Sequence, residues 1–166
     1  MNRILRFATI AAIAVLAFLA YQKFFPGEET KIRKLLKNVT DTVSFEANEG
    51  NLSKIAALTK LGGYFSPDVV LAVHTPGGRV QEIQGREELL EHAKAARFTL
   101  ASLKIEFVDI SVSVDPSKEM ATTELTAKAT IPTEKDFFVQ ELKLGLKKLD
   151  DQWRISRVET VRVFRQ

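Results

Sequence analysis

Two histidines are the first candidates for chemistry, because imidazole is the side chain that titrates near neutral pH. His74 ends an apolar run that begins at Val69, and it stands directly before a turn, Thr75 to Gly78. This position predicts either a general base at the end of a strand or a surface histidine beside a turn. His92 lies among charged residues and is expected to be solvated.

Metal and cofactor motifs are absent from the sequence. The two histidines stand 18 positions apart with no HxxxH or HExxH pattern, and the chain contains no cysteine. No glycine-rich phosphate loop and no GxSxG nucleophile elbow occurs. We therefore expect no bound metal and no cofactor, and the sequence assigns no catalytic residue.

Two carboxylates form a further candidate site. Glu141 and Glu159 lie in the last two alternating runs of the chain, which would bring them near each other or near neighbouring arginines if those runs are adjacent strands. Cross-strand ion pairs are the ordinary explanation of such a pattern. A functional acid pair is the alternative.

Two aromatic residues complete the set of pocket candidates. Tyr64 and Phe65 stand just before the first predicted strand, where aromatic side chains line either a pocket mouth or the core. The candidate pocket residues are thus Tyr64, Phe65, His74, Glu141 and Glu159.

Three segments with apolar residues at helical spacing are expected to position these side chains. They run from Glu28 to about Asn48, from Leu52 to about Leu61, and from Arg86 to Phe98. We expect Gly50 to end the first helix and Asn51 to cap the second.

The remaining elements are predicted strands. They are Val69–His74 and Val80–Ile83, which form a short hairpin, and then four long runs: Leu103–Val114, Met120–Ile131, Phe138–Leu146 and Trp153–Phe164. In the first long run the apolar phase shifts between Phe107 and Val108, which predicts a β-bulge that bends the strand. Trp153 is expected at the sheet edge. Three helices and a curved antiparallel sheet make an α+β domain.

The N-terminal segment predicts a membrane signal. Residues 7–21 carry no charged side chain, and apolar residues fall on every side of a helix drawn through them. Arg3 and Arg6 precede this run, and an aromatic and basic collar of Tyr21, Lys23 and Phe24–Phe25 follows it. An uncleaved transmembrane anchor and a cleaved secretory signal both fit this pattern.

The anchor interpretation gives a domain plan: residues 1–25 as the anchor or uncleaved signal, 26–30 as a linker, and 31–166 as one domain. A short N-terminus in the cytoplasm implies a single-pass protein of the inner membrane, with the soluble domain in the periplasm or the exterior. The absence of cysteine fits an oxidising compartment.

The net charge argues against nucleic acid as a partner. The formal charge is +3, and Arg3, Arg6 and Lys23 account for all of it, because residues 28–166 hold 21 basic and 21 acidic side chains. An electrically neutral domain lacks the basic surface that binds phosphate backbones.

Three phrases of the sequence resemble the nuclear transport factor 2-like superfamily, which includes ketosteroid isomerase and polyketide cyclase-type domains. They are EGNLSKIAALTKLGGYFSPDVVLAV, GREELLEHAKAARF and DDQWRISRVETVRV. The resemblance covers about residues 30 to 164 and implies a cone whose apolar mouth holds a small-molecule site. It also implies a homodimer formed through the sheets.

The isomerase catalytic groups do not carry over to this sequence. The resemblance places the general base at Val73–His74, the oxyanion tyrosine at about Val43 and the partner acid near Leu144, where Glu141 is the nearest carboxylate. Ketosteroid-isomerase chemistry is therefore not expected.

Two functions stay open. One is a non-enzymatic, membrane-tethered module that binds a partner protein or a small apolar ligand. The other is a small isomerase, cyclase or hydrolase that acts on an apolar substrate within the cone. Ionisable side chains converging inside the cone would favour the enzyme, and an interior filled by leucine, valine and phenylalanine would favour the binding module.

Overall fold

The structure, a computed structural model, describes residues 27–74, 80–131 and 137–164. The apolar segment 7–21 and the turn that follows His74 lie outside the described residues. Within those residues, no helix combines the length and the apolar character needed to cross a bilayer.

Three helices form where the apolar spacing predicts them. They are α2 (Glu28–Val43), α3 (Asn51–Gly62) and α4 (Arg86–Thr99). Helix α2 ends earlier than expected, because Ser44 turns to extended backbone and Phe45 forms a β-bridge with Leu103. The expectation that Gly50 ends this helix is wrong, since Gly50 is instead the N-cap of α3 and no side chain caps that end.

Six strands form one sheet in the order β2-β1-β6-β5-β4-β3. They are β1 (Phe65–His74), β2 (Val80–Gln84), β3 (Lys104–Val114), β4 (Met120–Thr130), β5 (Phe137–Leu149) and β6 (Gln152–Phe164). The prediction of an antiparallel sheet is wrong for one pair, since β1 and β6 run parallel. A parallel pair needs a long connection, and here one helix and four strands separate the two.

The phase shift in β3 is confirmed as a β-bulge. The pairing with β4 changes register between Val108 and Ser111, and Asp109 adopts a φ of 53° within that interval. Phe107 packs against the core before the bulge, and Ile110 packs against it after the bulge. The bulge therefore keeps apolar side chains on the inner face while the strand bends.

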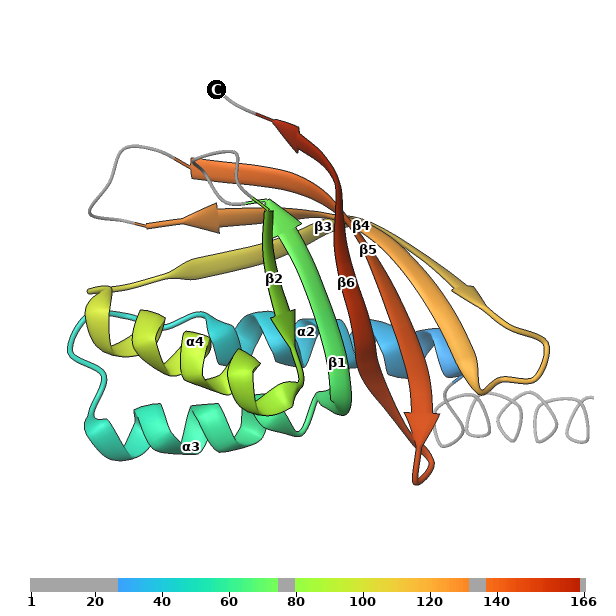
Figure 1. Cartoon of the computed structure of the whole chain (residues 1–166), viewed down its shortest axis with the longest axis horizontal. Coiled ribbons are helices and arrows are strands. Elements are labelled where there is room, and N and C mark those ends of the chain that lie inside the picture. Colours follow the sequence, from blue (N-terminus) through green and yellow to red (C-terminus); the bar gives the residue numbers. More distant parts are fainter. Residues whose placement is uncertain (1–26, 75–79, 132–136, 165–166) are drawn as a thin grey trace, which may run out of the picture.

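Helices and sheet form two layers with the core between them. In Figure 1 all three helices lie on one side of the curved sheet, and α3 packs on α2 and α4. Core side chains come from both layers: Ile32, Leu36 and Val39 from α2, Leu89 from α4, and Val69, Leu125, Leu144, Leu146 and Ile155 from the sheet. Trp153 belongs to this core at 5% exposure, so the expectation of an edge position is wrong.

The start of α2 is fastened to one end of the sheet. The indole Nε1 of Trp153 donates a hydrogen bond of 2.6 Å to the Glu28 carboxylate, and Lys148 Nζ lies 2.9 Å from the same oxygen. A bond from Lys31, together with those from Lys148 and Trp153, outweighs burial and lowers the pKa of Glu28 to about 2. Glu28 therefore stays ionised at neutral pH.

Candidate functional site

The interior of the cone is mainly apolar. Among the described residues, the buried polar side chains are Thr42, Ser66, Arg97, Thr123 and Gln140. None of these is a carboxylate or a histidine, so they supply no general acid–base pair. Likewise, no three His, Cys, Asp or Glu side chains of the described ranges gather closely enough to hold a metal ion.

Tyr64 and Phe65 belong to the packing rather than to a polar site. Phe65 is 7% exposed and lies in the core. The Tyr64 side chain packs against that core, and its hydroxyl lies 3.5 Å from Thr42 Oγ1. This contact places two hydroxyl groups next to each other beside the core.

His74 lies at the end of β1, as predicted. Its backbone joins a closed set of hydrogen bonds: its N–H donates to Thr160 Oγ1, that hydroxyl donates to Gln140 Oε1, and Gln140 Nε2 donates to the His74 carbonyl. The imidazole Nδ1 is buried and has no hydrogen-bond partner among the described residues. The hydrogen bonds of the His74 backbone therefore link three strands, β1, β6 and β5.

Glu141 and Glu159 do not pair with each other. In the β5–β6 register Glu141 stands opposite Arg162, and Glu159 stands opposite Lys143. Glu159 forms an ion pair with Arg157 on its own strand, at an exposed position. The two carboxylates therefore lie in separate cross-strand positions, and the five candidate residues do not converge on one pocket.

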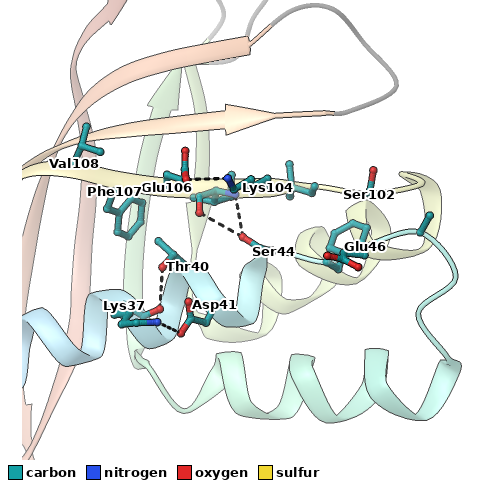
Figure 2. Close-up of a pocket in the computed structure, with 14 residues that line it drawn as sticks. Lys37, Thr40, Asp41, Ser44, Glu46, Ser102, Lys104, Glu106, Phe107 and Val108 are labelled. Carbon is teal, nitrogen blue, oxygen red and sulfur yellow. Dashed lines mark hydrogen bonds and ion pairs between the residues drawn. The ribbon is translucent and has the colours of Figure 1, made fainter.

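A groove of about 870 Å³ lies elsewhere, between the C-terminal half of α2 and the edge strand β3. Figure 2 shows Lys37, Thr40 and Asp41 of α2 on one side of it, and Lys104 and Phe107 of β3 on the other. Its volume falls within the range of ordinary ligand sites.

The backbone of β3 turns unpaired groups toward this groove. In an antiparallel ladder, residues alternate between those that bond the partner strand and those whose N–H and C=O point away from it. Leu103 and Ile105 belong to the second set, because the Phe45 backbone and the Ser44 hydroxyl bond their N–H and C=O groups. Phe107 follows in the same register. No described side chain bonds its N–H or C=O, so a short stretch of free strand edge faces the groove.

Both ends of this free edge are closed. At one end the Phe45 amide and carbonyl bond those of Leu103 at 2.8 and 2.9 Å. At the other end the bulge intervenes, and Arg33 Nη2 donates to the carbonyl of Ile110 at 3.0 Å. The unpaired N–H and C=O of Phe107 therefore lie between the Phe45–Leu103 bridge on one side and the bulge on the other.

A buried arginine supports the segment at one end of the groove. Arg97 of α4, which is 5% exposed, donates two hydrogen bonds of 2.7 and 2.8 Å to the Glu49 carboxylate and a third of 2.8 Å to the Thr42 carbonyl. Its guanidinium also lies 4.9 Å from the centre of the Phe45 ring. The hydrogen bonds from Arg97 lower the pKa of Glu49 below its usual value. The segment that carries Phe45 is thus fixed between α2 and α4.

Four of the five charged side chains that line the groove form ion pairs with each other, and Glu46 is the fifth. Lys37 and Asp41 form an ion pair of 2.6 Å on α2, and Lys104 and Glu106 form one of 2.9 Å on β3. Hydroxyl groups of Thr40, Ser44 and Ser102 and apolar atoms of Phe45, Ile105 and Phe107 provide the remaining surface. Apart from the single negative charge of Glu46, the groove offers hydrogen bonds and apolar contacts, which suits an uncharged ligand that has both kinds of group.

The sequence-based hypothesis did not identify this groove. The groove depends on where α2 ends, and the apolar spacing continued past Val43 to Ala47. The sequence does contain a pattern that could have identified Arg97 as buried, because it lies four residues after Ala93 on the inner side of its helix. A charged residue on the inner side of a helix indicates a buried partner, here Glu49.

Comparisons of the whole chain place the fold among known proteins. No protein-family model matches the sequence, and no curated protein matches it. A protein of unknown function from Mycobacterium tuberculosis is 22% identical with a TM-score of 0.64, over 84% of this chain and 77% of that one. A nuclear transport factor 2-like protein of unknown function from Pseudomonas putida KT2440 is 12% identical with a TM-score of 0.63, over 83% and 88% of the two chains.

A third solved structure is that of a candidate scytalone dehydratase from Novosphingobium aromaticivorans. It is 14% identical with a TM-score of 0.62, over 83% of this chain and 85% of that one. At such identities a likeness shows the fold and not the activity. The chain therefore has the nuclear transport factor 2-like fold that its sequence phrases resemble.

Proposed function

We propose that this chain is a non-enzymatic binding module, tethered to the inner membrane by its N-terminal segment, with its folded domain on the periplasmic or exterior side. Its ligand is an extended, uncharged peptide segment of a partner protein, and the ligand occupies the groove between α2 and β3. The free strand edge at Phe107 is the observation that carries this proposal.

The backbone geometry supports a peptide as the ligand. An extended segment laid along β3 gives its own N–H and C=O groups to those of Phe107, which is the chemistry of β-strand addition. The Phe45 backbone already binds Leu103 in this way, and the Ser44 hydroxyl binds the Ile105 backbone, so the groove continues an edge pairing that the chain itself begins.

The interior of the cone supports a module without catalysis. Leucine, valine and isoleucine side chains fill the space between helices and sheet, and the buried arginine is fully occupied by Glu49 and Thr42. Proton transfer in enzymes is most often carried by a titratable side chain positioned against the substrate. The described interior offers none at its centre.

Amide hydrogen exchange tests the peptide site directly. In the full-length chain, solubilised in a mild nonionic detergent, we expect the Phe107 amide to exchange fast and the amides of Glu106 and Val108 to exchange slowly, because these two face β4. The probe is an uncharged octapeptide of alternating valine and threonine. We expect it to slow exchange at Phe107.

Two matched controls make this test specific. A probe with proline at every second position lacks the donors for edge pairing and is expected to give no protection. The variant Thr40→Trp fills the groove and should abolish binding, whereas Lys94→Trp, at an exposed site of α4, should not. Equal protection in Thr40→Trp, or a Phe107 amide already slow without peptide, would contradict the proposal.

The tether has its own test. We expect the full-length chain to remain with the membrane fraction after alkaline carbonate extraction, at its full mass. Recovery of a shortened, freely soluble form would instead favour the cleaved signal.

A small enzyme acting on an apolar substrate is the second candidate. The observation that favours it is the buried and unpartnered Nδ1 of His74 at the end of β1. If this candidate holds, His74→Ala abolishes turnover of an apolar ketone or ester and leaves the peptide-dependent protection of Phe107 unchanged.

A further inference from the structure

Helix α3 exposes an apolar surface. Of its 12 residues only Leu61 and Gly62 are buried. Leu52 is 85% exposed and Ile55 is 56% exposed, and Phe98 of α4, which contacts Lys54 of this helix, is 50% exposed. We call Leu52, Ile55, Ala56 and Phe98 the α3 surface. Exposed apolar groups gathered in this way mark an interaction site.

The α3 surface is made by helical spacing. Leu52, Ile55 and Ala56 stand three and four residues apart, which places them on one side of the helix. The opposite side packs on α2 and α4 through Leu61 and Gly62, and Gly62 lies against Leu90 of α4. Both sides of α3 therefore carry apolar groups, whereas a helix that only covers a core needs one apolar side.

The charge of α3 has a single sign. The helix carries Lys54 and Lys60 and contains no acidic residue. Lys54 Nζ lies 4.8 Å from the centre of the Phe98 ring, so one cation borders the apolar groups directly. Apolar side chains flanked by lysines are typical of helices that lie at the surface of anionic bilayers, where the long lysine stems reach the lipid headgroups.

The N-terminal end of the domain lies in the same layer as this surface. The described chain begins next to Glu28, in the helical layer that also contains α3 (Figure 1). The uncharged segment 7–21 precedes it. Helix α2, with 16 residues, spans about 24 Å and runs from Glu28 toward the end of the helical layer where α3 begins (Figure 1), so the α3 surface meets the bilayer when this layer lies along the membrane.

We propose that the α3 surface rests on the anionic bilayer that holds the N-terminal anchor. This inference depends on the tether in the proposed function but not on the peptide groove. Because a tethered domain meets the bilayer at a high effective concentration, a weak contact is enough to orient it. The helical layer then faces the lipid, and the sheet faces away from it.

The absence of cysteine from the chain allows a direct test. Leu52→Cys and Ile55→Cys each introduce one thiol on the α3 surface, and Val161→Cys introduces one at a site that is 63% exposed on β6. The full-length variants are labelled with an environment-sensitive fluorophore and reconstituted in vesicles of phosphatidylcholine and phosphatidylglycerol. We expect a severalfold rise and a blue shift of emission at 52 and 55, and no change at 161.

A charge reversal refines the result. Lys60→Glu, made in the Leu52→Cys background, should lose most of the rise in vesicles that contain phosphatidylglycerol. Vesicles of phosphatidylcholine alone should give a smaller rise in the parent variant. Equal emission across all of these conditions would overturn the role of anionic lipid.

The remaining outcomes separate the two proposals. If the chain floats with the vesicles but the probes at 52 and 55 stay water-exposed, the α3 inference is wrong and the tether stands. If the chain does not float with the vesicles, the tether is wrong and the α3 inference falls with it. If the rise depends on the protein-to-lipid ratio, a second copy of the chain covers the surface, and the bilayer contact is refuted.

Discussion

Replacing Arg97 with methionine tests whether this buried cation stabilises the segment that carries Phe45. Methionine keeps most of the apolar stem and removes the three hydrogen bonds to Glu49 and Thr42. The Thr42 carbonyl then loses its charged partner, which costs about 1–3 kcal/mol. Loss of the contact with the Phe45 ring removes about 0.5–1 kcal/mol more.

Glu49 contributes less than a fully buried partner would. Its side chain is 19% exposed, so water replaces part of what Arg97 supplied. The total should therefore lie near the lower end of the about 3–5 kcal/mol that accompanies breaking a fully buried pair. We expect the free energy of unfolding to fall by about 3 kcal/mol, which leaves a folded domain if the parent is of ordinary stability.

Urea unfolding, followed by the emission of the single tryptophan, measures this change, because Trp153 is 5% exposed in the folded state. The control is Lys94→Met on the same helix, where an exposed ion pair of 3.8 Å with Glu91 is lost. That variant should change stability by less than about 1 kcal/mol. A loss below about 1 kcal/mol in Arg97→Met as well would refute the role assigned to the buried cation.

The pH dependence gives a second check on the same pair. Arg97 holds the pKa of Glu49 below its usual 4.5 in the folded state. The stabilisation is therefore complete above the unfolded pKa and is lost as the pH falls through the lower, folded one. The difference in stability between the parent chain and Arg97→Met should shrink as the pH is lowered below 4.5. A difference that grows in acid would contradict this assignment.

Three further predictions concern positions outside the groove. Glu28→Gln should lower stability at pH 7 by about 1–3 kcal/mol, because it removes the charge that binds Lys31, Lys148 and Trp153. Since the pKa of Glu28 is lowered from 4.5 to about 2 in the folded state, urea unfolding should show this loss fading progressively as the pH falls from 4.5 to about 2. Gln140→Leu should cost about 1–3 kcal/mol by urea unfolding, because the His74 carbonyl and Thr160 hydroxyl lose their buried partner. Gly85→Ala should cost about 1–3 kcal/mol in thermal unfolding, because Gly85 has φ 87° and ψ 153°, which an L residue rarely adopts; no loss would show that this turn relaxes.

Local patterns predicted the elements well. Apolar spacing located three helices and six strands, and the change of phase at Phe107–Val108 indicated the bulge that the β3–β4 register contains. Such signals lie within a few residues of each other, so the sequence displays them directly.

Features that depend on distant contacts were not predictable in this way. The parallel pairing of β1 with β6, the burial of Trp153 and the early end of α2 each depend on a partner far along the chain. The groove depends on one of these features, the early end of α2, and also on the free edge of β3. For that reason the five candidate residues chosen from the sequence lie apart from it.

The fastening of Glu28 has a mechanical consequence. A pull on the N-terminal segment reaches the domain at Glu28, whose bonds to Trp153 and Lys148 link it to the ends of β6 and β5. A force applied at that end must therefore break the bonds to both strands together before the first turn of α2 can unfold. Such a junction resists a pull applied at Glu28 better than a helix end without these contacts would.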